Sequence, residues 1–341
     1  MAVFKKISSA TLVIASLIGL STAVQAETTF NLSSWLPPSH PIVADMIQPW
    51  ADAVEAETGG NVKIRILPKP LGAPPAHFDL AKDGVADITY GVHGYQPGRF
   101  VLTKAIELPF LGDSAEAMSV AYWRIHEKHL ASADEHQGTR LLGVMSHGPG
   151  SIFNAERPVN SLADLKGLKI RVGGGVVNDA AKAVGVTALL KPASQSYELM
   201  SNGVADGVFF PQESIKSFKL TELVKHATII PGGMYNTSFF LVMNPGKFDA
   251  LSAEDQASIM RVSGENFARL AGKAWDAADI AGNEAMKADG VNVIDASTEF
   301  VDEIKSAVSQ IEAQWIEEVD TKGLDGAQIM KDLRAEINSM E

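Results

Sequence analysis

One arginine beside a run of glycines is the feature of this sequence that most directly suggests chemistry. Arg171 lies near the carboxyl end of a predicted strand, 168–172, and the glycines at 173–175 lead into a predicted helix. A planar guanidinium holds a carboxylate with two parallel hydrogen bonds, and the first N–H groups of a helix are unpaired and carry the positive end of its dipole. Together the arginine and the helix N-terminus predict a binding site for a carboxylate. On composition alone, an ion pair between Arg171 and an acidic surface residue is an equally good interpretation.

Loops that follow predicted strands hold further candidates for a binding site. Ligands of open α/β sheets collect at the carboxyl ends of strands, and aromatic side chains with a few polar neighbours line small-molecule pockets. The loops are 33–40, 91–98, 146–150, 207–211 and 232–238, and their candidate ligand-binding residues are Trp35, His93, Tyr95, His147, Phe209, Phe210, Tyr235 and Asn236. Each aromatic side chain alone is more typical of a core, but their coincidence at loop positions favours a pocket.

Patterns typical of enzymes are incomplete in this sequence. His126 and His129 are three positions apart, one short of the spacing that seats two imidazoles on zinc. The segment 171–179 follows a strand and opens a helix as a dinucleotide-binding loop does, but Asn178 stands where the third glycine is required. There is no Gly-x-Ser-x-Gly elbow and no phosphate-binding Gly-Lys-Ser/Thr loop. We therefore predict that the protein is not an enzyme and needs no metal or cofactor. The alternative is an exported lyase or hydrolase that uses a histidine of the loops above as its base.

The acidic balance of the chain argues against several kinds of partner. Lys and Arg together number 29 against 41 Asp and Glu, which gives a formal net charge of −12. Phosphate backbones and anionic lipid surfaces repel such a chain, so neither nucleic acid nor a membrane surface is an expected partner. The absence of cysteine excludes disulfides, thiolate metal ligands and a cysteine nucleophile.

Residues 1–26 are typical of a secretory signal peptide. Lys5 and Lys6 precede an apolar segment at 10–20 and a small-x-small exit that ends at Ala26. The apolar run is shorter than the ~20 residues that span a bilayer, which argues against a membrane anchor. We expect cleavage after Ala26, a net charge that moves from −12 to −14 through loss of the two lysines, and a mature chain in the periplasm. About 315 mature residues suit two domains of ordinary size.

Alternating strand and helix patterns indicate an α/β fold with two similar halves. The segment 28–66 has the order strand, helix, strand, with apolar residues at helical intervals in its middle part. The tetrapeptide GVAD occurs at 84–87 and again at 203–206, each time after a helical run and before a short apolar run. Its glycine is expected to end the helix and its aspartate to begin the strand. A corner that is used twice suggests two similar α/β lobes.

Three other patterns describe the rest of the chain. A helix is expected to begin after Ser114, which is a suitable N-cap. The strand-like segment 238–244, SFFLVMN, is expected to return to the first lobe, since no flexible linker separates two independent domains. The C-terminal part is mostly helical, and one helix face is predicted to pack into the core through Val301, Ile304, Val308, Ile311 and Trp315.

The most specific segments for a family resemblance are DLKGLKIRV at 164–172 and YELMSNGVADG at 197–207. WADAVEAETGGNVKIRILPKPLG at 50–72, KDGVADITYG at 82–91 and ELPFL at 107–111 add to them. With these segments the whole mature chain resembles the periplasmic solute-binding proteins of TRAP (tripartite ATP-independent) transporters, often called the C4-dicarboxylate-binding family.

The resemblance implies a two-lobe α/β receptor with a type II-like periplasmic binding protein fold. Crossing strands and a long lobe-spanning helix join the lobes, which close around a ligand in the cleft. It assigns 27–150 and 240–280 to lobe I, and 151–239 and 281–341 to lobe II, with one GVAD corner in each. Arg171 falls on the arginine with which the family grips the substrate carboxylate. The implied partners are a small carboxylate ligand and the membrane subunits of a TRAP permease; a ligand sensor for a receptor kinase is the alternative.

One departure from the family bears on the ligand. Members that bind sialic acid commonly have Gln-Glu-Asn-Pro where this chain has VFFP, so that Phe210 stands at the Asn position. A phenyl ring offers no hydrogen bond to a ligand hydroxyl or second carboxylate, and a polar group buried against it without a partner costs ~1–3 kcal/mol. We therefore expect a monocarboxylate with an apolar or aromatic body; a C4-dicarboxylate or a sugar acid is the alternative.

Overall fold

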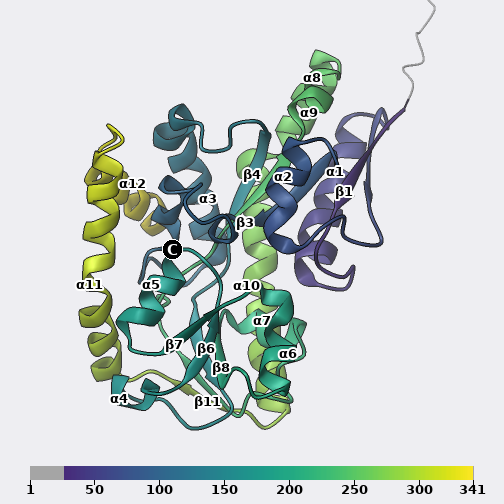
Figure 1. Cartoon of the computed structure of the whole chain (residues 1–341). Helices are drawn as coiled ribbons and strands as arrows, with labels where there is room; N and C mark the ends of the chain where they lie inside the picture. Colours follow the sequence, from purple (N-terminus) through teal and green to yellow (C-terminus); the bar gives the residue numbers. More distant parts are fainter. Residues whose placement is uncertain (1–26, 341) are drawn as a thin grey trace, which may run out of the picture.

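The computed structural model describes residues 27–340, which fold around two β-sheets with helices packed about them (Figure 1). The predicted signal peptide at 1–26 lies outside the described residues. Within 27–340, every helix is too short or too polar to cross a membrane.

The first sheet combines strands from the N-terminal part of the chain with one that returns from much further along. Its order is β2–β1–β3–β10–β4, with bounds Val62–Ile66, Thr28–Ser33, Ile88–Val92, Ser238–Met243 and Arg140–Ser146. β1 is parallel to β2 and β3, whereas β10 is antiparallel to β3 and β4. The prediction that SFFLVMN returns to the first lobe is therefore confirmed.

The second sheet is built around the strand that carries Arg171. Its order is β11–β9–β5–β8–β6–β7, with bounds Asn292–Asp295, His226–Ile229, Ser151–Asn154, Gly207–Phe210, Lys169–Val172 and Thr187–Leu190. β6 is parallel to β7 and β8, while β5 is antiparallel to β8 and β9. The chain passes to this sheet between β4 and β5 and leaves it between β9 and β10. The predicted α/β class, with two halves and crossing strands, is confirmed.

Helices connect these strands and cover the sheets. The α-helices are α1 (Gln48–Glu57), α2 (His77–Lys82), α3 (Ala115–Ile125), α4 (Leu162–Leu165), α5 (Val176–Ala183), α6 (Ser196–Ser201), α7 (Gln212–Ser217), α8 (Pro245–Asp249), α9 (Ala253–Val262), α10 (Gly264–Ala288), α11 (Thr298–Asp320) and α12 (Gly326–Asn338). Two short 3₁₀ segments matter for the site, η3 (His93–Tyr95) and η4 (Leu102–Glu107). Ser114 caps α3 as predicted, because its side chain accepts a hydrogen bond from the N–H of Ala117.

The two GVAD corners have the same structure, one in each sheet. The glycine has a positive φ, 71° in the first copy and 66° in the second, which residues with a side chain rarely adopt. In each copy the aspartate exchanges two hydrogen bonds with one residue of the neighbouring parallel strand. Asp87 makes this exchange with Asn31 of β1, and Asp206 makes it with Lys169 of β6. The corner thus docks a helix-to-strand junction on the strand beside it, in both halves of the molecule.

Helix α10 is the long element that runs along both halves of the molecule (Figure 1). Glycines let it approach each half closely: a Cβ on Gly272 would lie 2.4 Å from the Cα of Glu116 in α3, and one on Gly282 would lie 2.3 Å from the carbonyl oxygen of Gln212 in α7. Backbone approaches this close leave no room for a side chain.

The same helix also supplies carboxylates to the helices that it contacts. Asp276 accepts from the N–H groups of Ala115 and Glu116 at the start of α3, and Asp279 accepts from the N–H of Glu213 in α7, at 2.7 Å. Acidic side chains at helix N-termini satisfy unpaired N–H groups and interact favourably with the dipole. α10 therefore fixes the position of α7, which contributes to the cavity described below.

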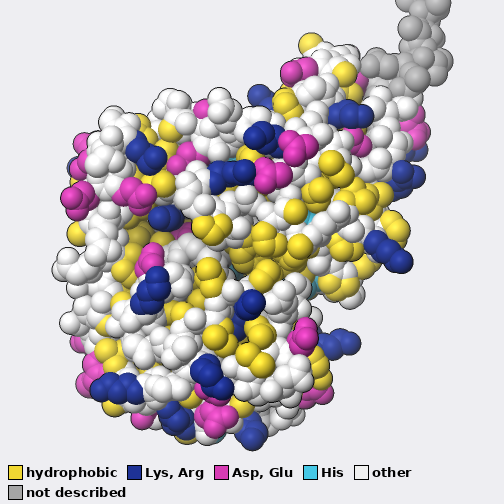
Figure 2. Space-filling model, in the orientation of Figure 1, with side chains coloured by type: hydrophobic (Ala, Val, Ile, Leu, Met, Phe, Trp, Pro, Cys, Tyr) yellow, Lys and Arg dark blue, Asp and Glu magenta, His cyan; other side chains and the backbone are white. Residues whose placement is uncertain are grey.

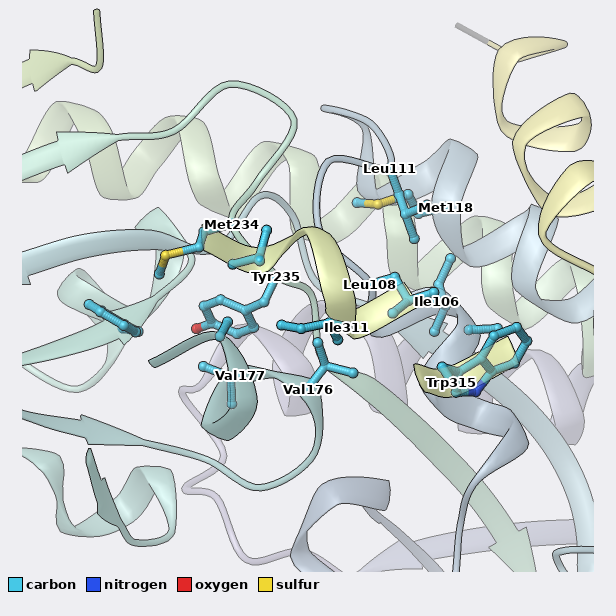
Figure 3. Close-up of a cluster of buried hydrophobic side chains, with 14 of the residues drawn as sticks. Ile106, Leu108, Leu111, Met118, Val176, Val177, Met234, Tyr235, Ile311 and Trp315 are labelled. Atoms are coloured by element: carbon cyan, nitrogen blue, oxygen red, sulfur yellow. The ribbon is translucent and has the colours of Figure 1, made fainter. Parts of the chain in front are cut away.

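The C-terminal helices complete the largest core, which Figure 3 shows in part. α11 buries Phe300, Ile304, Val308, Ile311, Trp315 and Val319. The predicted face is therefore confirmed except at Val301, which is partly exposed while Phe300 takes the buried position. α12 packs against α3. The lobe boundaries given above stay a prediction.

Charged and apolar side chains are distributed differently on the face seen in Figure 2. Lys and Arg are scattered, whereas hydrophobic side chains gather across the middle of this face. This face therefore lacks the basic stripe with which proteins hold phosphate backbones.

Candidate ligand-binding site

A cavity lies where strands of both sheets end. The first sheet contributes Val92 at the end of β3 and Phe239 at the start of β10, and the second contributes Arg171 from β6 and Phe210 from β8. Residues of both halves of the molecule therefore line the same cavity.

The cavity brings together six of the predicted site residues, namely Trp35, Tyr95, His147, Arg171, Phe210 and Tyr235. It also contains side chains that sequence reasoning did not select, among them His40, Glu213, Phe218, Phe239 and Trp275. His40 belongs to a loop that the sequence marked as a candidate. The others lie on elements whose register against the cavity depends on tertiary packing, so no local pattern identifies them.

Three predicted residues do not line this cavity. His93 lies in a separate aromatic cluster of the first half, where its Nε2 is 2.9 Å from Nε2 of His136. Phe209 is fully buried in the large core, because successive side chains of β8 point to opposite faces and Phe210 takes the cavity side. Asn236 is buried beside the cavity rather than in its wall.

Arg171 is 2% exposed and is held by the protein through two of its nitrogens. Nε donates to the carbonyl oxygen of Lys191 at 2.9 Å, and Nη2 donates to the hydroxyl of Tyr95 at 3.4 Å. The guanidinium carbon lies 4.5 Å from the centre of the Phe210 ring. These contacts orient the guanidinium from its edge and from one face.

No carboxylate of the described residues forms an ion pair with Arg171, and its Nη1 has no hydrogen-bond partner among them. The alternative interpretation of Arg171 as half of a surface ion pair is therefore wrong. Burial lowers the pKa of Arg171 from its ordinary value, because the charged form loses hydration. A buried cation without an anionic partner is costly, and an anion that enters the cavity would compensate it.

Tyr95 of η3 reaches from the first half of the molecule to the Arg171 site. Its oxygen accepts from the N–H of Ala193 at 2.8 Å and from Arg171. Since both of these bonds use the oxygen as acceptor, the hydroxyl hydrogen of Tyr95 is available to a third group in the cavity.

The glycine loop after Arg171 contacts the other half of the molecule instead of an open cleft. A Cβ on Gly174 would lie 1.6 Å from the carbonyl oxygen of Gly94 in η3. The N–H of Val176, at the start of α5, donates to Oε2 of Glu107 at 3.0 Å, and Oε1 of Glu107 accepts from the hydroxyl of Ser238. The expectation that the N-terminus of α5 holds a ligand carboxylate is wrong, because the carboxylate of Glu107 occupies it.

Stacked rings connect Arg171 with a second polar group of the cavity. The rings of Phe210 and Phe218 are stacked at 5.6 Å, and the imidazole of His40 lies 5.1 Å from Phe218. Beyond these rings Nε2 of His40 is 3.6 Å from Oε1 of Glu213, with both side chains buried. In the lining of the cavity, the contacts of Phe210 and Phe218 therefore link a cation to an imidazole that lies beside a carboxyl group.

Burial changes the charge states of these groups. It lowers the pKa of His40 to about 3 and that of His147 to about 4, so both rings are neutral at pH 7. Burial raises the pKa of Glu213 to about 7, although the nearby hydroxyls of Ser217 and Ser214 act in the opposite direction. Arg171 is consequently the full positive charge in the cavity lining.

The helix that carries His126 and His129 forms no metal site. His129 contacts Asp332 of α12 at 2.7 Å, and His126 packs near the rings of Trp123 and His136. Across residues 27–340 no group of three or more potential metal ligands is suitably placed to hold an ion.

Comparison with known proteins decides which family this architecture represents. Residues 32–318 match the family described as bacterial extracellular solute-binding protein, family 7. The chain belongs to this family. Its members are solute receptors of transport systems, so the predictions that the protein is a TRAP-type solute-binding protein and not an enzyme are confirmed. Family members act in the periplasm, which agrees with the expected location.

Two solved structures are similar along nearly the whole chain. A TRAP periplasmic solute-binding protein of Bordetella bronchiseptica with bound (R)- and (S)-mandelate is 44% identical, with a TM-score of 0.90 over 92% of this chain and 100% of that one. A TRAP solute-binding protein from a marine metagenome, specific for aromatic acid ligands and in complex with metahydroxyphenylacetate, is 34% identical, with a TM-score of 0.86 over 92% of this chain and 100% of that one.

A curated relative covers the same length. The outer membrane transporter protein TsaT of Comamonas testosteroni is 30% identical over 324 residues, which are 94% of this chain and 96% of the relative. The similarity therefore extends through both halves and the C-terminal helices rather than to one lobe.

Proposed function

We propose that this protein binds an aromatic monocarboxylate in the cavity between its two halves and delivers it to a TRAP permease. The observation that carries the proposal is the buried guanidinium of Arg171, which has no carboxylate partner among residues 27–340. Nη1 and the second hydrogen of Nη2 are the donors that remain for a ligand carboxylate. The hydroxyl of Tyr95 adds a third donor from the other half of the molecule.

The rest of the cavity wall suits an aromatic body. Phe210 and Phe218 form a stacked pair, and Trp275 and Phe239, 5.4 Å apart, contribute further rings to the wall. Aromatic pairs add ~0.5–1.5 kcal/mol beyond the area that they bury. The aromatic acids bound by two similar receptors, mandelate and metahydroxyphenylacetate, support the same ligand class for this chain.

Ligand capture depends on closure of the two halves. Tyr95, which follows β3 of the first sheet, and Arg171, on β6 of the second, belong to different halves, so a carboxylate that contacts both favours the closed arrangement over any more open one. We infer that the chain is exported by the signal peptide at 1–26, binds its ligand in the periplasm, and presents the closed complex to the membrane subunits of the permease.

Calorimetric titration with matched ligands tests this function. Benzoate, phenylacetate and mandelate are compared with the corresponding amides, which keep the ring and lose the negative charge. The acids are expected to bind and the amides to bind at least 100-fold more weakly, because the charge of Arg171 then stays uncompensated. Arg171→Gln should abolish this preference.

The control variant is Arg334→Gln, which removes an arginine that pairs with Glu312 far along the C-terminal helices. It should bind the acids as the parent protein does. Absence of binding to every aromatic acid, or equal binding by Arg171→Gln, would contradict the proposal.

A further inference from the structure

Four buried polar atoms in the cavity wall lack the hydrogen bonds that buried polar atoms normally have, namely Nε1 of Trp35, Nε1 of Trp275, Nε2 of His40 and Oε1 of Glu213. The last two face each other. Nε2 of His40 and Oε1 of Glu213 both have no partner among the described residues, although His40 is 3% exposed and Glu213 is 2% exposed. Their separation of 3.6 Å is too long for a good hydrogen bond. Such atoms are rare in folded proteins and call for a partner that the chain does not supply.

The hydrogen-bonding role of each atom follows from its own neighbours. Nδ1 of His40 accepts from the N–H of Ile42 at 3.3 Å, so the proton of the neutral imidazole is on Nε2, which is therefore a donor. Oε2 of Glu213 accepts from the hydroxyl of Ser214 at 2.8 Å, which leaves Oε1 as the acceptor that faces His40. The pair thus offers one donor and one acceptor at the same place.

One hydroxyl group satisfies both atoms at once. Its oxygen accepts from Nε2–H of His40 while its hydrogen is donated to Oε1 of Glu213, and an oxygen at ordinary hydrogen-bond lengths from both atoms fits a separation of 3.6 Å. A second carboxylate has no hydrogen to donate, and its charge would be repelled by the carboxylate form of Glu213.

We propose that His40 and Glu213 form a hydroxyl-recognising subsite, so that the ligand is an aromatic monocarboxylate with a hydroxyl group remote from its carboxylate. The inference rests on the proposed function, because it places the carboxylate on Arg171. The contacts of Phe210 and Phe218 link the two polar groups, and these rings give the ring of the ligand its place.

Contacts outside the pair fix the positions of both His40 and Glu213. The N–H of Glu213 donates to Asp279 of α10 at 2.7 Å, while the ring of His40 packs on Phe218. Buried groups fixed in this way discriminate strongly against a ligand that lacks the matching hydroxyl, since their atoms then stay unpaired.

Calorimetric titration of the parent protein and three variants with paired ligands tests the inference. The probes are benzoate against 3- and 4-hydroxybenzoate, phenylacetate against 3- and 4-hydroxyphenylacetate, and isophthalate as a dicarboxylate. In the parent protein, at least one hydroxylated acid should bind about tenfold or more tightly than its unsubstituted partner, as expected for one hydrogen bond to a buried polar group. Isophthalate should bind more weakly than benzoate.

The variants are His40→Phe, which keeps a ring against Phe218, Glu213→Met, which keeps an unbranched chain of similar length, and Glu213→Gln, which keeps hydrogen-bonding capacity. His40→Phe and Glu213→Met should lose the preference for the hydroxylated acid and still bind benzoate. Glu213→Gln should retain part of the preference, which a purely structural role of the carboxyl group would not produce. Thermal unfolding of each variant identifies those that fold.

The outcomes separate this inference from the proposed function. If no aromatic acid binds, the proposed function fails and this inference fails with it. If benzoate and phenylacetate bind as tightly as all of their hydroxylated partners, or if the preference survives in both His40→Phe and Glu213→Met, the hydroxyl subsite is contradicted while the carboxylate site on Arg171 stands.

Discussion

The guanidinium of Arg171 lies over the ring of Phe210, with 4.5 Å between the guanidinium carbon and the ring centre. A cation over an aromatic face is attracted by the ring quadrupole by ~0.5–2 kcal/mol. The ring offers no hydrogen-bond acceptor of its own, so the guanidinium keeps Nη1 and one hydrogen of Nη2 for a ligand. This relationship explains why a phenyl ring is compatible with an anion site: it positions the charge without neutralising it.

Replacement of Phe210 by leucine should weaken ligand binding with little effect on folding. The change removes the cation–ring contact and the stack with Phe218, so the dissociation constant of an aromatic acid should rise about tenfold. The matched control is Phe209→Leu at the next position, whose side chain lies in the large core. It should lower the free energy of unfolding by about 1–1.5 kcal/mol and leave affinity unchanged. Titration calorimetry measures the affinity of each variant, and thermal unfolding measures its stability. If Phe209→Leu weakened binding and Phe210→Leu did not, Phe210 would not be the residue that lines the binding site.

A methyl group at Gly174 should obstruct closure. It would lie 1.6 Å from the carbonyl oxygen of Gly94 on the other half of the molecule, and overpacking of this kind costs ~1–3 kcal/mol. The cost falls on the closed form, so Gly174→Ala should weaken binding about 10- to 100-fold and reduce the compaction that ligand causes in small-angle scattering. Gly246→Ala is the control, because its methyl group would meet the side chain of Asn244 at an ordinary 3.4 Å. Unaltered affinity in Gly174→Ala would mean that binding does not require this contact.

Glu107 should couple folding to ligand binding. Its buried carboxylate accepts from Val176 of α5 and from Ser238 of β10, and burial raises its pKa. Glu107→Ala leaves these donors unpaired, at a cost of ~1–3 kcal/mol for each buried group. Both the stability of the protein and its affinity for the ligand should fall.

Glu135→Ala provides the comparison. Glu135 accepts from the N–H groups of Val101 and Leu102 within one half of the molecule, so its loss should reduce stability alone. Chemical denaturation measures the stability of both variants, and calorimetric titration measures their affinity for the ligand. An equal loss of affinity in the two would argue against a specific role of Glu107 across the halves.

Acid should destabilise the protein through its buried neutral histidines. Burial lowers the pKa of His93 to about 3 and that of His126 to about 4, from an ordinary value of 6.5. Between pH 6.5 and 4 the unfolded chain binds protons at these rings that the folded protein does not bind. The contribution of each such ring to the free energy of unfolding therefore falls as the pH falls, by ~1.4 kcal/mol per pH unit.

The comparison of parent protein with His126→Gln isolates one of these rings. Carboxyl groups whose pKa burial raises, such as Glu107, Glu213 and Asp279, act in the opposite direction, but their contributions cancel between the two proteins. Between pH 6 and 4.5 the free energy of unfolding of His126→Gln should fall less steeply than that of the parent protein. The difference in slope should be about 1.4 kcal/mol per pH unit, which corresponds to one proton fewer taken up on unfolding. Denaturant titrations at several pH values measure the slopes, and identical slopes would contradict neutral burial of this ring.

Local sequence predicted the GVAD corners and the position of Arg171 at a strand end beside the cavity. Each of these depends on one or two residue types that few others can replace. The glycine of GVAD adopts a positive φ, and its aspartate hydrogen-bonds to the backbone of the neighbouring strand. Both features recur in the two halves. Arg171 was identified from its position at a strand end, and the return of 238–243 to the first sheet from its apolar pattern.

The sequence did not predict strands β5, β7, β9 and β11, which have four residues each. Such short segments carry too few side chains for a period to emerge. The His40–Glu213 pair was missed for a different reason: 173 residues separate its members in the chain. The interpretation of the α5 N-terminus failed likewise, since only the folded structure brings Glu107 to Val176.

Arg171 is the proposed partner of the ligand carboxylate. A crystal structure of the protein soaked or grown with an aromatic acid tests this role most directly. Both carboxylate oxygens are expected within hydrogen-bond distance of Nη1 and Nη2 of Arg171, with the ring of the ligand against Phe210. A carboxylate bound elsewhere, with Arg171 paired to an acidic residue of the protein itself, would contradict it.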